Sequence, residues 1–170
     1  PIPLVIDADG LNCLAGGIDA VASARVPVVL TPHPGEMSRL SGASSSEIQA
    51  DRVGAARTFA REHGVFLVLK GAGTVVAAPD GTCFVNSTGN PGMASGGMGD
   101  VLTGVIAALL AQGLSPRDAV EIGVCLHAQA GDAADRIDLF AGRIEDLPGM
   151  SREQVSITCS GLELDVANRF

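Results

Sequence analysis

The strongest chemical signal in the chain is a glycine-rich run between residues 86 and 100. It reads Asn-Ser-Thr-Gly-Asn-Pro-Gly-Met-Ala-Ser-Gly-Gly-Met-Gly-Asp, and an apolar helix pattern from Val101 to Leu110 follows it at once. Glycine lets backbone N–H groups approach a ligand closely, and a helix N-terminus adds free N–H groups and a positive dipole. The segment is therefore suited to hold an anion such as phosphate.

Asp100 is the only acidic residue in this run and stands at its end, where the helix should begin. A carboxylate in that place can accept a proton from a hydroxyl while the neighbouring amides hold a phosphate, so Asp100 is the candidate catalytic residue. The alternative is a flexible loop without a ligand, because short glycine motifs also arise by chance. The position of the run between a strand-like segment and a helix favours a functional site.

Lys70 follows the buried strand pattern Val65–Leu69 and precedes Gly-Ala-Gly-Thr. A lysine in this place can reach phosphate oxygens, with help from the following amides and the Thr74 hydroxyl. The spacing of a Walker A loop is absent, so the segment is not a P-loop of that kind. A solvated lysine in an ordinary turn is the alternative.

His33 and Glu36 flank a Pro-Gly pair, directly after the strand pattern Val26–Leu30. Carboxylates near phosphates bind Mg²⁺ directly or through water, so Glu36 is a candidate metal ligand. His33 is a candidate donor to a ligand oxygen. The two prolines of residues 31–36 predict a stiff loop without regular structure, and a surface loop with incidental polar groups is the alternative.

Three further polar residues are expected to have structural or supporting roles rather than catalytic ones. Asp7 and Asp9 follow the short apolar run Leu4–Ile6, in a segment that we expect to be a loop as far as Gly10. His127 lies within an apolar helix pattern, where a packed histidine is the more common outcome.

Helix patterns alternate with these strand patterns. Ser44–His63 is the clearest amphipathic helix, residues 100–112 form a helix behind the glycine-rich run, and a third helix runs from Ser115 through Ala134. Residues 75–85 read as a hairpin around a tight turn. The alternation predicts an α/β domain with a mostly parallel central sheet, whose ligands bind beyond the carboxyl ends of the strands, where the polar loops lie.

The composition of the 170 residues argues against several classes of partner. A net charge of −8 disfavours nonspecific binding to nucleic acid or to an anionic membrane, and there is no Trp or Tyr to stack on bases. No apolar stretch is long enough to cross a membrane. The four cysteines are scattered without a CxxC pair, which indicates reduced thiols in the cytoplasm rather than a zinc site.

The two ends of the chain differ from its middle. The sequence starts without Met in the strand-like Pro-Ile-Pro-Leu-Val-Ile, which indicates a fragment or an incomplete reading frame. After about Arg136 charges are denser and the periodicity is poor. We therefore divide the chain into a domain portion at residues 1–136 and an atypical tail at residues 137–170.

Four segments occur in a characteristic order over about residues 2–135. They are Val5-Ile-Asp-Ala-Asp-Gly-Leu-Asn, Leu30-Thr-Pro-His-Pro-Gly-Glu-Met, Leu69-Lys-Gly-Ala-Gly-Thr and the glycine-rich run. Together they resemble the ADP/ATP-dependent NAD(P)H-hydrate dehydratases. The resemblance implies a ribokinase-like, carbohydrate-kinase-related three-layer domain with a mostly parallel sheet, which here lacks its N-terminal part.

The resemblance also implies a lyase activity in metabolite repair. Members of the family remove water from the S form of NADHX or NADPHX and use ADP or ATP as the driving nucleotide, with Mg²⁺. The hydroxyl of the hydrated ring is phosphorylated, and phosphate is then eliminated to restore NAD(P)H. A small-molecule substrate, a nucleotide and a homo-oligomeric assembly are therefore the expected partners, without nucleic acid or membrane.

Matching positions carry the family's roles onto this chain. The catalytic base toward the hydroxyl would be Asp100, which with His33 would contact the hydrated cofactor. The transferring phosphoryl group would lie on the amides of Gly96, Gly97, Met98 and Gly99. The nucleotide would be bound by Lys70, Gly71, Ala72, Gly73, Thr74 and Gly99.

Two departures from the family keep other functions open. Members are longer at the N-terminus, and the tail after Arg136 does not match the usual ending. A ribokinase-like kinase for a vitamin precursor alcohol is one alternative, although such a kinase would usually carry Thr-Pro-Asn where this chain has Thr31-Pro-His. A noncatalytic nucleotide-binding fragment is the other, so the isolated chain is expected to be inactive alone if it is truncated.

Overall fold

The computed structural model describes residues 2–140, 157–159 and 162–164. A five-stranded sheet forms its centre, in the order β1-β2-β3-β4-β5, so that β1 and β5 are the edge strands. Pairings β1–β2 and β2–β3 are parallel, and pairings β3–β4 and β4–β5 are antiparallel. The strands are β1 (Leu4–Ile6), β2 (Val28–Leu30), β3 (Phe66–Leu69), β4 (Thr74–Ala77) and β5 (Cys83–Asn86).

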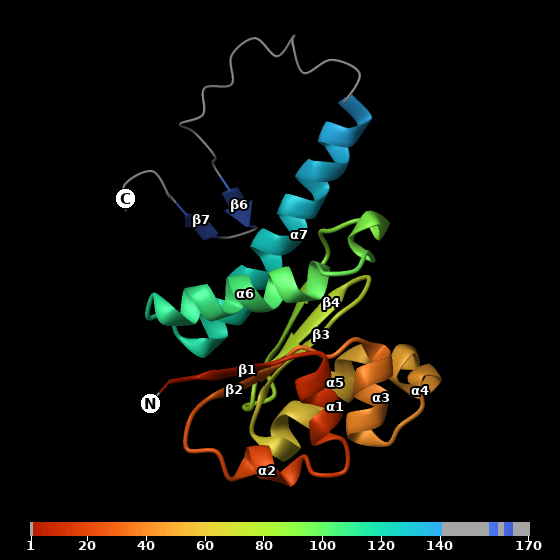
Figure 1. The fold of residues 1–170 in the computed structure, drawn as a ribbon, viewed down its shortest axis with the longest axis vertical. Coiled ribbons are helices and arrows are strands. Elements are labelled where there is room, and N and C mark those ends of the chain that lie inside the picture. Colours follow the sequence, from red (N-terminus) through yellow and green to blue (C-terminus); the bar gives the residue numbers. More distant parts are fainter. Residues whose placement is uncertain (1, 141–156, 160–161, 165–170) are drawn as a thin grey trace.

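Helices cover both faces of this sheet, as Figure 1 shows. One face carries α1 (Asp9–Leu14), α2 (Asp19–Ala22), α3 (Pro34–Ser41), α4 (Ser45–Ala50) and α5 (Arg52–His63). The other face carries α6 (Met98–Ala111) and α7 (Pro116–Phe140), with the short 3₁₀ helix η1 (Pro91–Met93) beside α7. The arrangement is the expected three-layer α/β/α domain.

Two hydrophobic cores result because successive strand residues point to opposite faces of a sheet. Leu67 and Leu69 of β3 pack with Met37 and Phe59 under the α1–α5 layer. Val68, between them, packs on the other face with residues of α6 and α7, including Ile106 and Val120. The near-continuous apolar runs of the central strands are thus buried on both sides, as the sequence predicts.

The predicted single helix from Ser44 to His63 is wrong, because the structure has two helices that meet at Asp51. The backbone of Asp51 is not helical, with φ −142° and ψ 75°, and its carboxylate accepts the Gly54 N–H at 2.8 Å as the N-cap of α5. Aspartate favours such caps over helix interiors because its side chain competes for backbone N–H groups. Ser44 and Glu47 form a capping box at the start of α4.

The predicted stiff loop at residues 31–36 is also wrong in part, because α3 begins at Pro34. Proline is tolerated at the first helical position, where its missing N–H has no partner to lose. His33 caps the helix, and Glu36 closes a capping box. The expected loop from Asp7 to Gly10 is likewise shorter than predicted, since α1 begins at Asp9.

The remaining elements follow the sequence with shifts at their ends. The hairpin is confirmed as β4 and β5, α6 starts at Met98 rather than at Asp100, and α7 continues past Ala134 to Phe140. In the tail, β6 (Ile157–Cys159) pairs with β7 (Leu162–Leu164). The boundary at residue 136 stays a prediction. Within the described residues, no helix combines the length and apolar character that a membrane crossing requires.

Candidate active site

Three parallel strands bring polar side chains to one edge of the sheet. Asp7 follows β1, Thr31 follows β2 and Lys70 follows β3. The Lys70 Nζ lies 2.7 Å from Asp7 Oδ1 and 3.7 Å from Glu36 Oε2. We call Asp7, Glu36 and Lys70 the strand-end cluster; it joins three segments that are far apart in the sequence.

Helix α6 closes over this cluster with its first turns. The Thr103 hydroxyl donates to Asp7 Oδ2 at 3.0 Å. A methyl group added at Gly99 would lie 3.1 Å from Lys70 Nζ and 3.4 Å from Asp7 Oδ2. The distance to the lysine is shorter than most contacts that methyl groups make in proteins. The absence of a side chain at Gly99 therefore lets the helix N-terminus approach the lysine.

Asp7 is ionised and paired in this environment. Burial raises the pKa of Asp7, but the hydrogen bond and the charge of Lys70 lower it, as do hydrogen bonds from Ala8 and Thr31, and the pKa lies below its ordinary value. The sequence assigned Asp7 a supporting role, and its contact with Lys70 agrees with that role.

His33 and Glu36 are fixed by the start of α3. His33 Nδ1 accepts the N–H groups of Gly35 at 2.9 Å and Glu36 at 3.3 Å, and Glu36 Oε2 accepts the His33 N–H at 2.7 Å. An imidazole whose Nδ1 accepts carries its proton on Nε2, which lies 3.5 Å from Glu36 Oε1. The His33 side chain is half exposed, so that N–H can also face a ligand.

The loop from Lys70 to Thr74 folds back on itself. The Thr74 hydroxyl donates to the Gly71 carbonyl at 3.0 Å, and Gly71 and Gly73 have φ of +138° and +65°. Beneath the loop lies Arg52, a residue that the sequence analysis did not select. No local signal marks its contact with the loop, because its partners there lie 17 to 21 positions further along the chain.

The glycine-rich run ends in an uncapped helix N-terminus. Gly97 is the N-cap of α6, with φ +88°, and no side chain among the described residues caps it. The first amides of a helix have no partner within the helix. The Met98 N–H donates to the Ser95 carbonyl at 3.4 Å, whereas the N–H groups of Gly99 and Asp100 have no hydrogen-bond partner among the described residues, so these two can face an anion. Asp100 lies in this first turn with its side chain exposed.

Helix α7 anchors the other end of the run. Asp132 accepts the Gly89 N–H at 2.9 Å and the Asn90 Nδ2 at 3.2 Å. His127 of α7 is partly buried, and burial lowers its pKa more than a hydrogen bond to the Met98 backbone raises it. Its Nε2 is buried without a hydrogen-bond partner among the described residues. The sequence analysis did not select Asp132, whose partners lie more than 40 positions away.

Some of the predicted site residues lie in or beside the strand-end cluster, and others are exposed in their loops. Lys70, Glu36, His33 and Gly99 gather around the strand-end cluster, and Asp100 lies one residue beyond Gly99. Ala72 is exposed in its loop, and Gly96 is exposed in the glycine-rich run. Among the described residues, no three His, Cys, Asp or Glu side chains gather closely enough to hold a metal ion by themselves.

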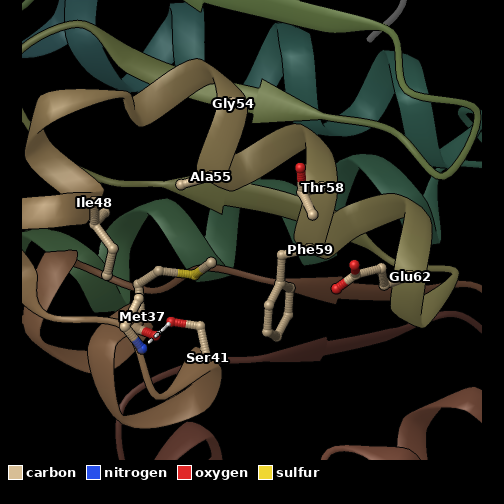
Figure 2. A pocket seen from close by; sticks show the side chains of 9 residues that line it. Met37, Ser41, Ile48, Gly54, Ala55, Thr58, Phe59 and Glu62 are labelled. Atoms are coloured by element: carbon tan, nitrogen blue, oxygen red, sulfur yellow. Dashed lines mark hydrogen bonds between the residues drawn. The ribbon is translucent and has the colours of Figure 1, made fainter.

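A separate cavity of about 320 Å³ lies among α3, α4 and α5 (Figure 2). Met37, Ile48 and Phe59 contribute apolar side chains to it, and the Ser41 hydroxyl there is bound to the Met37 carbonyl. None of the predicted site residues lines this cavity. It is therefore distinct from the candidate active site.

Comparison with known proteins decides the family. The model of the NAD(P)H-hydrate dehydratase family matches residues 1–142. The chain belongs to this family. It is 47% identical to a bifunctional NAD(P)H-hydrate repair enzyme of Moorella thermoacetica over 96% of the chain and 33% of the relative, and 40% identical to an ADP-dependent (S)-NAD(P)H-hydrate dehydratase of Neisseria meningitidis over 91% and 54%.

Solved structures agree with this family and with the predicted fold. The ADP/ATP-dependent NAD(P)H-hydrate dehydratase of Bacillus subtilis, crystallised with ATP and Mg²⁺, matches with TM-score 0.70 and 37% identity, over 85% of this chain and 49% of that one. A ribokinase-like superfamily protein of Enterococcus faecalis matches with TM-score 0.67 and 33% identity, over 78% and 45%. The predicted ribokinase-like fold is confirmed. The chain spans from about a quarter to about half of the length of the curated relatives that it matches.

Proposed function

We propose that this chain carries the nucleotide-binding and catalytic part of an ADP-dependent dehydratase for the S form of NAD(P)H-hydrate. The observation that supports this most directly is the approach of the α6 N-terminus to Lys70, through Gly99. It brings a lysine, a row of helix amides and the exposed Asp100 into one neighbourhood. Phosphoryl transfer needs chiefly such positioning and charge stabilisation.

In this proposal Asp100 accepts the proton of the hydroxyl on the hydrated ring. The hydroxyl oxygen attacks the terminal phosphorus of ADP, and the bond from that phosphorus to the bridging oxygen breaks, so that AMP leaves. The amides of residues 96–99 hold the transferred group. The ring carbon–oxygen bond then breaks and phosphate departs with that oxygen. The adjacent ring carbon releases a proton to water, and its C–H electron pair restores the ring double bond of NAD(P)H.

The other side chains bind and orient the two substrates. The Nε2–H of His33 donates to the hydrated cofactor, which is consistent with its half-exposed ring and with the two amides at its Nδ1. Residues 70–74 and Gly99 bind the nucleotide. Lys70 already carries two carboxylate neighbours, so much of its charge is compensated before a nucleotide arrives.

Glu36 suits Mg²⁺ only as a single carboxylate ligand to a metal that the nucleotide and water also hold. Mg²⁺ commonly keeps several waters and takes one or two carboxylates together with substrate phosphates. Glu36 offers one carboxylate next to Lys70, with Oε2 occupied by the His33 N–H, so it suits a metal that is held mainly by the nucleotide and water. Bound there, Mg²⁺ would neutralise charge on the phosphates.

The location and assembly of the protein extend this proposal. Cys13 and Cys83 are free thiols, which is consistent with a cytoplasmic protein. Leu4 on the open edge strand β1, and Val101 on α6, are large apolar side chains that are about half exposed. A homo-oligomer is the proposed way to cover them, and sedimentation velocity would test it.

The main test is an assay of the purified chain with S-NADHX, ADP and Mg²⁺. An ADP-dependent rise in the near-ultraviolet absorbance of the reduced nicotinamide ring would support the dehydratase. Binding of ADP in calorimetry without this rise would favour the second candidate, a noncatalytic nucleotide-binding fragment. The observation behind this candidate is that the chain covers only part of the length of its relatives. Absence of ADP binding would contradict both.

A further inference from the structure

Arg52 makes more contacts to the 70–74 loop than any role on its own helix requires. It is the first residue of α5, and its Nη2 donates to the carbonyl oxygens of Leu69 at 3.0 Å, Lys70 at 3.3 Å and Gly73 at 3.5 Å. Its Nη1 donates to Gln49 Oε1 at 2.8 Å. One guanidinium thus binds carbonyls at both ends of the loop.

The packing beneath the loop depends on the same group. A methyl group added at Gly71 would lie 3.1 Å from Arg52 Nη1 and 3.2 Å from Nη2. Gly71 also has a φ of +138°, a conformation that side-chain-bearing residues rarely adopt. The loop therefore rests directly on the guanidinium plane, and its backbone follows the position of Arg52.

The charge of Arg52 is satisfied by carbonyl dipoles rather than by an acid. None of the ion pairs among the described residues involves Arg52, in contrast to Lys70, which has two carboxylate neighbours. Its Nε is buried and has no hydrogen-bond partner among the described residues. Burying part of a guanidinium with this set of partners costs free energy. We expect such a group where the geometry that its rigid donors impose on the loop serves the protein.

We propose that Arg52 is the positioning residue of the nucleotide-binding loop: by tying the carbonyls of Leu69, Lys70 and Gly73 together, it presents the loop amides and Lys70 to the nucleotide without touching the nucleotide itself. The inference rests on the proposed function, because it assumes that this loop binds ADP. It goes beyond that function by naming a residue of another helix that sets nucleotide affinity.

Lysine cannot replace arginine in this role. A guanidinium presents a rigid, planar fork of N–H donors, whereas an ammonium is a compact point charge with a different reach. The variant R52K therefore keeps the charge and removes the fork. Arg57 lies on the same helix with an exposed side chain, so R57K is a matched control for the change of residue type.

The test combines two readouts on the full chain. Calorimetry measures the ADP affinity of wild type, R52K and R57K, and hydrogen exchange measures the protection of the amides at residues 70–74 without ligand. We expect R52K to weaken ADP binding by about tenfold or more, because a single hydrogen bond to a charged group contributes about that factor. We expect faster exchange confined to this loop, and R57K to match wild type in both readouts.

The other possible outcomes distinguish failure of the inference from failure of the proposed function. Wild-type ADP affinity in R52K would overturn the inference. Weaker binding with faster exchange throughout the chain would also overturn it, since that pattern describes general destabilisation. Failure of the wild-type chain to bind ADP would overturn the proposed function and the nucleotide part of the inference, while the exchange data would still decide whether Arg52 holds the loop.

Discussion

The strand-end cluster and the glycine-rich run differ in how far each is built before a ligand arrives. In the cluster, Asp7 and Glu36 have side chains only 8% and 7% exposed, and each lies beside the Lys70 ammonium. In the run, residues 94–97 are exposed, as is Asp100. The same candidate site therefore combines a preformed half with a half that faces solvent.

The difference follows from the groups involved. Buried charges must be paired, because an isolated ion in the protein interior loses most of its hydration. The amides of a helix N-terminus are satisfied by water until an anion replaces it. We infer that the cluster sets where the nucleotide end of the site lies, and that the exposed amides of the run meet the phosphoryl group.

The largest effect is expected from Asp100→Asn. If Asp100 is the base, its replacement should lower the turnover of S-NADHX by about 10²–10⁴-fold, the usual contribution of a general base. Calorimetric ADP affinity should change little, because the substitution leaves the helix amides in place. Asp19→Asn, which changes an exposed first-turn aspartate of α2, is the matched control and should leave turnover unchanged. Equal loss of turnover and ADP binding would remove the assigned role.

Lys70→Met should have the largest effect on stability. It leaves the carboxylates of Asp7 and Glu36 buried without their cation, which costs about 3 kcal/mol for a buried pair. Arg117→Met breaks an exposed pair with Asp80 and should cost about 1 kcal/mol or less. Urea unfolding measures both. If the two variants lost equal stability, the strand-end cluster would be no more preformed than the surface.

Asp132→Ala tests the solvent-exposed half. It removes the acceptor of the Gly89 N–H and of the Asn90 side chain, and we expect a loss of about 1–2 kcal/mol in the free energy of unfolding. Hydrogen exchange at residues 89–93 should accelerate while the cluster stays protected. Asp132→Asn, which keeps one acceptor oxygen, should fall between wild type and alanine. Unchanged exchange at these amides would show that α7 does not anchor the run.

The same two regions show what a sequence can predict. Asp7, His33 and Lys70 could be placed together because each follows an apolar strand, and parallel strands end at one edge of a sheet. The contacts of Arg52 and Asp132 could not, since helical and strand periodicity report only on nearby residues. The helix at Pro34 was missed for a local reason: a proline that breaks a helix interior is compatible with its first position.

The smallest effect that bears on the comparison is the acid dependence of stability through Asp7. Burial raises its pKa, but the hydrogen bond and charge of Lys70, together with hydrogen bonds from Ala8 and Thr31, lower it by more, so its pKa in the folded state lies below the ordinary value. A group whose pKa is lowered by folding stabilises the protein fully above its unfolded pKa of about 3.9 and loses that contribution as pH falls through the folded pKa. Unfolding free energy should therefore decline below about pH 4, and less steeply in Asp7→Asn.

The control Asp19→Asn should keep the wild-type slope. Identical slopes for all three proteins would mean that Asp7 is not held as an ion by Lys70, and the contrast between a preformed cluster and an open run would lose its electrostatic basis.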